Sequence, residues 1–302
     1  MKKITIVLVC MIVAIELILR FVFGFCDTVL FREDTDYEYI AQPNQNRYRF
    51  RKHINYNAHS MRSEEIDSTA VILLGLGDSV INGGGLTDQS ELATTILSDS
   101  LSKLKGKQVQ FLNVSAGSWG PDNCYAYIKK HGFFKAKEIW LFVSSHDAYD
   151  NMEFSGVVGK HPSYPKEQYS FALLELCDRY LMPRLEKKWK KSGKEVSREK
   201  ELGINKKKID SEFNQGFQKL YKLANEHKIP LHIYLHAEIN ELERRAYNEQ
   251  GQKILEFAKN NNIPVLKDLE KDLKKEDFRD EIHLSPKGQL KLAKNVLESM
   301  TK

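Results

Sequence analysis

The fold is decided by residues 70–85, which read AVILLGLGDSVINGGG. A short apolar run that ends in glycine and polar residues is typical of a buried strand in a parallel sheet. Ser79 leaves this strand at its carboxyl end, where open α/β sheets form their ligand sites, and the flanking glycines let backbone approach a ligand closely. A plain turn can also contain Gly-Asp-Ser, so this stretch alone does not separate a turn from a site.

Outward from this stretch, short apolar runs alternate with helical patterns. The pattern predicts strands at 70–76, 109–114, 138–144, 231–235 and 263–266, and helices at 90–104, 122–131, 210–226, 238–260 and 286–300. This alternation is typical of βαβ units, so we expect an α/β domain with one five-stranded parallel sheet, doubly wound by helices. Its site should lie at the carboxyl ends of the strands.

The N-terminal segment predicts a membrane anchor. Residues 4–26 contain only two charged side chains, Glu16 and Arg20, which lie one helical turn apart and can pair. A helix of this length extends about 34 Å, enough for a hydrocarbon core of about 30 Å. A cleaved signal peptide is the alternative, but no small-x-small cleavage site follows and the bulky Val9 before Cys10 argues against lipoprotein processing.

The charge distribution predicts the orientation of the anchor and limits the kinds of molecule that the protein binds. Lys2 and Lys3 should stay in the cytoplasm, which predicts a single-pass protein of the inner membrane with an extracytoplasmic domain. The net charge of +5 is local, because residues 184–208 hold eleven Lys/Arg and four Glu, a net of +7, and the rest of the chain carries −2. This stretch is either an ordinary solvated face or a surface for anionic lipid or acidic polysaccharide, and we expect no nucleic-acid partner.

Composition and spacing define the expected division of the chain. With 41% hydrophobic residues the chain can build a core, and four cysteines are too few and too scattered for a disulfide framework or a C-x-x-C zinc site. We expect an anchor at 1–26, a polar and irregular stalk at 27–68 that wraps onto the domain, and a catalytic domain at 69–302. A Lys-rich insertion interrupts that domain at about 150–208.

A second polar motif, Asp280-Glu-Ile-His283, precedes the last predicted helix. An Asp three residues before a His can orient the imidazole and stabilise its protonated form, which leaves the other ring nitrogen to accept a proton from a serine. Alternatively, Asp280 and His283 only cap the helix that Pro286 begins. Both motifs fall at the same edge of the predicted sheet, which favours a site. The G-x-S-x-G, dinucleotide and P-loop motifs all fit the stretch after residue 74 less well.

Four blocks of the chain resemble the SGNH (GDSL-type) hydrolases: residues 77–79, 113–120, 144–147 and 280–283. The resemblance implies a three-layer, flavodoxin-like fold over residue 70 to the C-terminus, and hydrolysis or transfer of acyl esters without a metal ion or cofactor. It implies Ser79 as nucleophile, His283 as general base and Asp280 as its orienting acid. Together with the anchor, the chain resembles membrane-bound polysaccharide O-acetyl esterases and acetyltransferases.

The two middle blocks depart from the family pattern. The resemblance places the oxyanion hole at Ser79, at the backbone of Gly117 and Ser118, and at His146, which stands where the family has asparagine. A neutral imidazole donates one hydrogen bond and a protonated one adds charge. Alternatively, His146 is an ordinary loop histidine.

Several aromatic and histidine side chains have two interpretations. Trp119 and Tyr149 follow the middle blocks and could stack on a sugar, although ordinary packing is as good an explanation. His232 and His236 share one face of a predicted strand, but no third metal ligand is apparent, so we expect structural roles and no metal site.

These observations predict serine-dependent hydrolysis or transfer of O-acyl groups, in particular acetyl, on an envelope or extracellular carbohydrate through an acyl-enzyme. The expected partners are the acylated glycan, the inner membrane through residues 4–26, and a membrane protein that donates acyl groups. The alternative is a non-catalytic glycan-binding component of a polysaccharide assembly complex.

Overall fold

A five-stranded parallel sheet forms the centre of the computed structural model, which describes residues 2–185 and 212–301. The strands in spatial order are β6 (Val109–Ser115), β5 (Val71–Gly77), β7 (Ile139–Ser144), β8 (Leu231–His236) and β9 (Val265–Lys267), and every neighbouring pair is parallel. Numbered along the chain this order is 2-1-3-4-5, the flavodoxin-like arrangement. The predicted α/β class and sheet are therefore confirmed.

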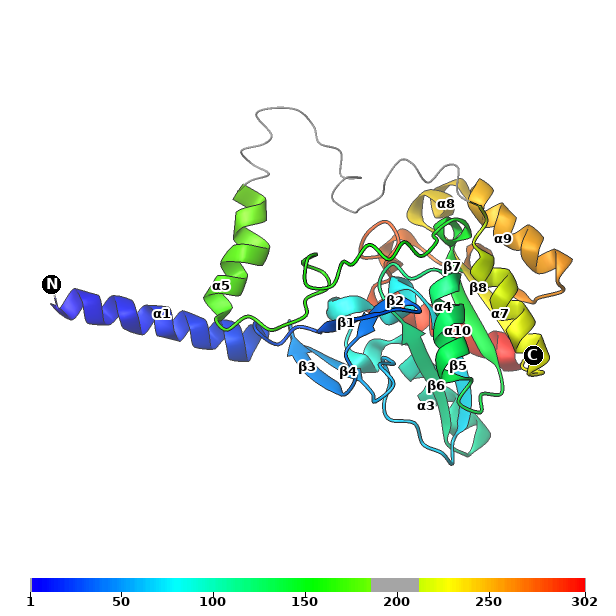
Figure 1. The fold of residues 1–302 in the computed structure, drawn as a ribbon, viewed down its shortest axis with the longest axis horizontal. Helices are drawn as coiled ribbons and strands as arrows, with labels where there is room; N and C mark the ends of the chain where they lie inside the picture. The colour runs from blue at the N-terminus through cyan, green and yellow to red at the C-terminus, as the bar shows by residue number, and fades with distance from the viewer. Residues whose placement is uncertain (1, 186–211, 302) are drawn as a thin grey trace.

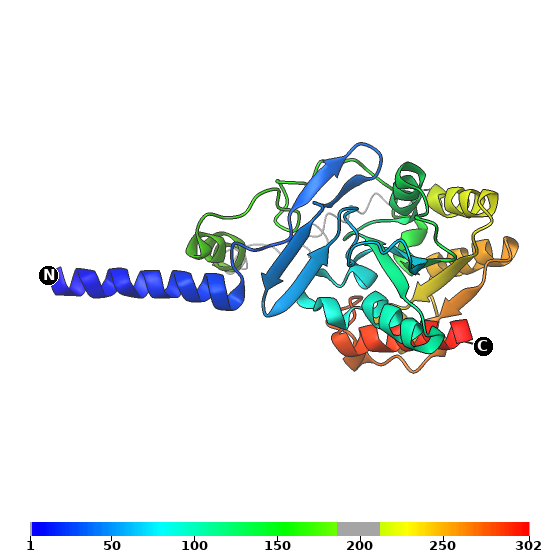
Figure 2. The same cartoon turned by 90° about the horizontal axis from the view of Figure 1, so that it is seen from below.

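Helices cover both faces of the sheet (Figure 1; Figure 2). On one face lie α4 (Pro121–His131), α7 (Gln215–Glu226) and α9 (Glu249–Asn260), and on the other α3 (Ala93–Lys105) and α10 (Pro286–Thr301). Successive residues of β7 point to opposite faces of the sheet. Ile139 and Leu141 therefore pack in the core under α4, α7 and α9, and Trp140 packs in the core under α3 and α10. Burial on both faces explains why the strands are continuous apolar runs rather than alternating ones.

The predicted helices are present, with two differences. The predicted helix 238–260 is two helices, α8 (Ile239–Arg244) and α9, because Arg245 adopts a left-handed conformation and Asn248 then caps α9. Short helices α2 (Ser79–Asn82) and η3 (Ser145–Ala148) follow β5 and β7 directly, and two 3-10 turns, η1 (Gly84–Leu86) and η2 (Gln89–Glu91), precede α3. The first residues of the predicted helix 210–226 lie outside the described residues.

The prediction that residues 27–68 are irregular holds only in part. Residues 57–68 contain turns and bends without a strand or helix. Residues 31–56 instead form two antiparallel hairpins, β1 (Phe31–Asp34) with β2 (Glu38–Ala41), and β3 (Gln45–Arg49) with β4 (Lys52–Tyr56). The turn of the second hairpin consists of Phe50 and Arg51, both with positive φ, instead of the Asn-Gly pair that usually marks such a turn. The first hairpin lies against the domain, where Tyr37 is fully buried.

The N-terminal helix α1 (Lys2–Phe23) has no buried residue and is long and apolar enough to cross a membrane. It projects away from the α/β domain (Figure 1). Glu16 and Arg20 form the expected ion pair at 3.3 Å. After the domain's third strand, the chain returns to this helix at α5 (Ala172–Leu176), which continues through a π-helical turn, η4 (Cys177–Leu181). Most of the predicted Lys-rich stretch, residues 186–211, lies outside the described residues.

Candidate active site

Ser79 is the first residue of α2, immediately beyond the carboxyl end of β5. Asp78 caps this short helix, since its carboxylate accepts a hydrogen bond of 2.8 Å from the backbone N–H of Val80. A side chain at Gly77 would put its Cβ 2.8 Å from the carbonyl oxygen of Phe142 on β7. Glycine is therefore needed just before the serine because the neighbouring strand lies so close.

Ser79, His283 and Asp280 form one chain of hydrogen-bonding groups. The Nε2 atom of His283 lies 2.9 Å from Oγ of Ser79, and its Nδ1 atom lies 2.8 Å from Oδ2 of Asp280. Asp280 also accepts hydrogen bonds from the backbone N–H groups of Ile282 and His283, at 3.1 and 2.8 Å. Partial burial raises the pKa of Asp280, but these hydrogen bonds outweigh it and hold that pKa below its usual value. An ionised Asp280 keeps the proton on Nδ1 and leaves Nε2 free to accept the serine proton.

A second, fully buried His–Asp pair supports the loop that carries this triad. His236, at the end of β8, lies 2.6 Å from Asp268 through Nδ1, and its Nε2 lies 2.9 Å from the carbonyl oxygen of Ile282. Burial lowers the pKa of His236, but the charge of Asp268 and the hydrogen bonds raise it overall. A protonated His236 donates to both groups and fixes the residue before His283. His236 has the expected structural role, directly behind the loop that carries Asp280 and His283. The sequence spacing gave no sign of Asp268 as its partner.

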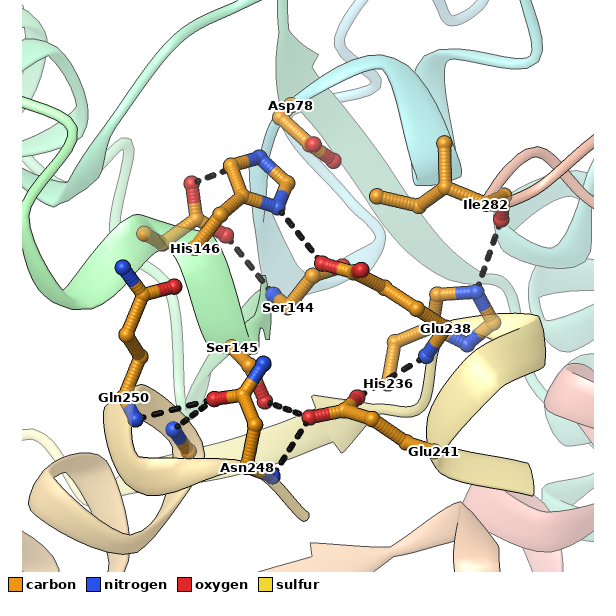
Figure 3. A network of polar contacts seen from close by, with 12 residues as sticks. Asp78, Ser144, Ser145, His146, His236, Glu238, Glu241, Asn248, Gln250 and Ile282 are labelled. Atoms are coloured by element: carbon orange, nitrogen blue, oxygen red, sulfur yellow. Dashed lines mark hydrogen bonds and ion pairs between the residues drawn. The ribbon is translucent and has the colours of Figure 1, made fainter. Parts of the chain in front are cut away.

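His146 follows β7 in η3 and lies close to three carboxyl groups. Its Nδ1 atom is 3.3 Å from Oε1 of Glu238, and Figure 3 shows the ring between Glu238 and Asp78. Although burial lowers the pKa of His146, the carboxyl groups of Asp147, Glu238 and Asp78 raise it to about 10. The hydrogen bond from His146 in turn lowers the pKa of Glu238. At neutral pH the ring is therefore an imidazolium, and both of its nitrogens are donors.

Beneath this pair a buried network fixes Glu238 and the end of β7 (Figure 3). Glu241 accepts hydrogen bonds from the hydroxyl of Ser145 at 2.5 Å, from the backbone of Asn248 at 2.8 Å and from the backbone of Glu238 at 3.0 Å. Asp147 accepts one from the backbone of Ser144 at 2.7 Å. The sequence motifs did not single out Glu238, the N-cap of α8, or Glu241 within α8, because both lie far along the chain from the other site residues.

Asp78, His146 and Asp147 are also the one group of metal-ligand side chains found among the described residues, with potential ligand atoms within 4.8 Å of one another. Three such atoms could hold a divalent cation. The ion pair of His146 with Asp147, at 3.7 Å, accounts for the same charges by itself. We therefore treat these residues as an ion-pair cluster.

The loop after β6 contains the two other residues expected at the oxyanion hole. Ser118 is exposed and adopts a left-handed conformation with φ of 57°, and Gly117 is half-buried. The carbonyl oxygen of Gly117 accepts hydrogen bonds from the hydroxyls of Tyr39 and Tyr164, at 2.8 and 3.1 Å. The first hairpin thus helps to hold this loop, which the prediction of an irregular stalk did not anticipate.

Of the two interpretations of Trp119, contact with a sugar is wrong and ordinary packing is right. Its side chain is 1% exposed, and its indole N–H donates a 2.9 Å hydrogen bond to the carbonyl oxygen of Tyr39, so it belongs to the core. Tyr149 is partly buried and packs edge-on against Phe213. His232 stacks on Trp140 with ring centroids 4.7 Å apart, in keeping with a structural role.

The buried Arg62, also unmarked by any motif, holds the glycine-rich loop that follows Ser79 and α2. Its guanidinium donates to the carbonyl oxygens of Asn82 at 2.5 Å and Thr87 at 2.6 Å, and to that of Gly84. Arg279, next to Asp280, donates to the carbonyl oxygen of Gly83 at 3.2 Å. Two arginines that lie far apart in the sequence therefore both stabilise this loop through hydrogen bonds to its carbonyl oxygens.

No protein-family model matches the chain, and a search of curated proteins finds no match. Among solved structures the chain is similar to a lipase/acylhydrolase from Enterococcus faecalis, with 11% identity, 76% of this chain and 95% of that chain covered, and a TM-score of 0.44. It is similar to AlinE4, an SGNH-hydrolase family esterase, with 14% identity, 79% and 97% covered, and a TM-score of 0.38. It is also similar to a carbohydrate acetylesterase family member from Sinorhizobium meliloti, with 11% identity, 76% and 97% covered, and a TM-score of 0.40.

These structures include a member of the family that the four sequence blocks indicated. At such identities and TM-scores, the chemistry of this chain has to be argued from its own side chains. What those side chains provide is a serine with a positioned base, an orienting carboxylate, and a cationic donor at the same edge of the sheet.

Proposed function

We propose that this protein is a serine esterase or O-acyltransferase that acts on acylated, in particular acetylated, carbohydrate outside the inner membrane. The observation that carries the proposal is the unbroken chain from Asp280 through His283 to Ser79, with contacts of 2.8 and 2.9 Å. Nucleophile, base and orienting acid within hydrogen-bond reach of one another define nucleophilic acyl transfer.

In the first half-reaction, Oγ of Ser79 attacks the ester carbonyl while Nε2 of His283 takes its proton. The tetrahedral intermediate carries its negative charge on the former carbonyl oxygen, toward the backbone amides of Ser79, Gly117 and Ser118 and the imidazolium of His146. When the intermediate collapses, the carbon–oxygen bond to the alcohol breaks and His283 returns the proton to the leaving oxygen. Ser79 then holds the acyl group as an ester.

In the second half-reaction a hydroxyl group removes the acyl group from Ser79. Water yields the free acid and makes the protein an esterase, whereas a sugar hydroxyl yields a new sugar ester and makes it an acyltransferase. His283 deprotonates either nucleophile and returns the proton to Ser79. The two activities differ only in which hydroxyl reaches the acyl-enzyme.

The setting of this chemistry follows from α1, which we propose to be an uncleaved single-pass anchor. With Lys2 and Lys3 on the cytoplasmic side, the α/β domain lies outside the inner membrane. Acylated envelope polysaccharides are then within its reach, and an acyltransferase would take its acyl group from a membrane-bound donor.

The test is covalent labelling and acetate release by the full chain in detergent. A fluorophosphonate should label Ser79, identified by mass spectrometry, and the protein should release acetate from p-nitrophenyl acetate and from an acetylated polysaccharide. Ser79→Ala should abolish both, whereas Ser299→Ala, an exposed serine on α10, should change neither. Glycan binding without labelling or acetate release would overturn catalysis in favour of the non-catalytic alternative.

A further inference from the structure

Exposed apolar side chains outside α1 are concentrated in one place. Nine large hydrophobic side chains of the described residues beyond α1 are exposed, and five of them fall within residues 171–185. These five are Phe171, Leu174, Leu181, Met182 and Leu185, with exposed fractions between 42% and 64%. Such a concentration on a helix marks an interaction surface rather than scattered surface residues.

Two of the four charged side chains of residues 171–185, Glu175 and Arg179, point the other way, toward the protein, whereas Asp178 and Arg184 are exposed. Glu175 on α5 is fully buried and lies 2.5 Å from Arg49 of the second hairpin, and it accepts a 2.6 Å hydrogen bond from the backbone of Cys26. Arg179 contacts the same carboxylate at 3.1 Å. A helix that buries a glutamate–arginine pair while it exposes leucines departs from the pattern of a helix that faces only water.

The same helix is joined to α1 through the two charged residues of that anchor. Glu16 accepts hydrogen bonds from the backbone N–H groups of Ala172 and Leu173, at 2.7 and 2.9 Å, and Arg20 donates to the carbonyl oxygen of Ser170 at 2.7 Å. Glu16 lies seven residues before the end of α1, a distance of about 10 Å along a helix. The start of α5 is therefore held alongside the outer part of α1, below the level at which the domain begins.

The two views show the orientation of the helix. In Figure 1 α5 runs across the direction of α1, and Figure 2 shows it nearly end-on beside the C-terminal part of α1. If α1 crosses the membrane, α5 lies roughly in the membrane plane. Between the two helices is a hollow of about 540 Å³ with an apolar lining except for Glu16, which includes Ile12 and Val13 of α1 and Phe171 and Leu174.

We propose that residues 171–185 form an interfacial helix whose apolar face lies among the lipid acyl chains of the outer leaflet. The proposal rests on the proposed membrane anchor, because the apolar face of the helix continues the lipid-facing surface of α1. Amphipathic helices in the interface bury their apolar face about 5–10 Å into the boundary of headgroups and acyl chains, the depth at which Glu16 holds this one. Glu16 and Arg20 thus serve to attach the interfacial helix to the anchor, and the Glu175–Arg49 pair attaches it to the domain.

The experiment uses spin labels on single cysteines of the full chain, reconstituted in vesicles of phosphatidylcholine and phosphatidylglycerol. Labels at Leu174→Cys and Leu181→Cys report on the helix, and a label at Ile12→Cys reports on the anchor. Labels at Leu104→Cys and Leu290→Cys, exposed leucines of α3 and α10, are the matched controls. Power saturation then compares the accessibility of each label to oxygen, which partitions into lipid, with that to a water-soluble nickel chelate.

The background for these variants replaces three native cysteines, Cys10, Cys26 and Cys177, by serine and leaves the buried Cys124. Because all five labelled positions are exposed, the labels should not disturb folding. We expect the ratio of oxygen to nickel accessibility at positions 174 and 181 to resemble that at position 12 and to exceed that at the two controls several-fold.

Three results would overturn the proposal, and they are distinguishable. Water-like ratios at positions 174 and 181 with a lipid-like ratio at position 12 would refute the interfacial helix alone. Low accessibility to both reagents at positions 174 and 181 would show that another protein covers the helix. A water-like ratio at position 12 as well would refute the anchor and, with it, the interfacial helix, while leaving the proposed chemistry at Ser79 untouched.

Discussion

Replacing His236 by phenylalanine should lower the stability of the fold and loosen the loop that carries Asp280 and His283. The ring of His236 is buried and stacks on Phe278, with centroids 5.5 Å apart, and phenylalanine is the apolar residue closest to it in shape. The substitution removes two hydrogen bonds, the 2.6 Å contact to Asp268 and the 2.9 Å contact to the carbonyl oxygen of Ile282. The substitution therefore removes the polar atoms of the side chain and keeps an aromatic ring in their place.

The expected loss of stability follows from what the substitution leaves behind. Breaking a buried ion pair costs about 3–5 kcal/mol, because the remaining charge has no partner. Asp268 would keep its hydrogen bonds from the backbone of Ala237 at 2.8 Å and from the hydroxyl of Tyr247 at 3.3 Å, which favours the lower end of that range. We expect the free energy of unfolding to fall by about 3 kcal/mol.

The same substitution should reduce turnover without contacting substrate. Once the carbonyl oxygen of Ile282 loses its donor, the next residue, His283, is free to shift relative to Ser79. A displacement of about 1 Å costs on the order of 10²-fold in rate, so kcat should fall by about that factor while KM stays nearly constant.

The measurements are urea unfolding followed by circular dichroism, and steady-state hydrolysis of p-nitrophenyl acetate. His232→Phe is the matched control, because His232 sits on the same strand, stacks on Trp140 and has only a weak contact of 3.9 Å, to Glu138. It should lose less than about 1 kcal/mol and keep its turnover. If His236→Phe behaved like His232→Phe in both assays, the role of the second His–Asp pair would be refuted.

Three further predictions concern the site itself. Ser79→Ala and His283→Ala should each remove nearly all turnover, and the double variant should lose little more, since parts of one proton-transfer unit are strongly non-additive; multiplying losses in single-turnover assays would contradict a shared triad. His146→Ala should slow acyl transfer by about 10²-fold and His146→Asn should recover much of it, measured as the burst rate of acyl-enzyme formation. An unchanged rate in His146→Ala would remove it from the oxyanion hole. Glu238→Gln should lower the pKa of His146 from about 10, so that the variant loses activity at a lower alkaline pH than the parent; identical pH–rate profiles would show that the charge of His146 is not used.

The sheet could be predicted closely because both of its faces are buried. A strand without a solvent face is a continuous apolar run, and the five predicted runs each overlap the observed strand. The hairpins of residues 27–68 were missed because their short strands are partly exposed and the turn at Phe50 and Arg51 lacks glycine. The break between α8 and α9 depends on one left-handed residue, Arg245, which no local pattern marks.

The site could be predicted only where function depends on short, local motifs. Asp280 and His283 lie three residues apart, and Ser79 follows a strand, so sequence alone predicted that they meet at one edge of the sheet. The residues behind them come from distant segments, as Asp268 and Arg62 do, and their roles depend on burial rather than spacing. For Trp119 the sequence left contact with a sugar and ordinary packing equally open, because a position next to a motif does not show that the side chain faces the core.

The histidine at position 146 and its acidic surroundings are best understood together. An asparagine side chain donates from its amide at any pH, whereas an imidazole has two donors only when protonated. The carboxylate of Glu238, 3.3 Å from Nδ1, stabilises that protonated form. Nε2 then keeps its hydrogen, with Asp147 as its ion-pair partner at 3.7 Å. In the proposed mechanism the imidazolium directs this N–H at the oxyanion, which makes Glu238 a condition for histidine to serve where the family pattern has asparagine.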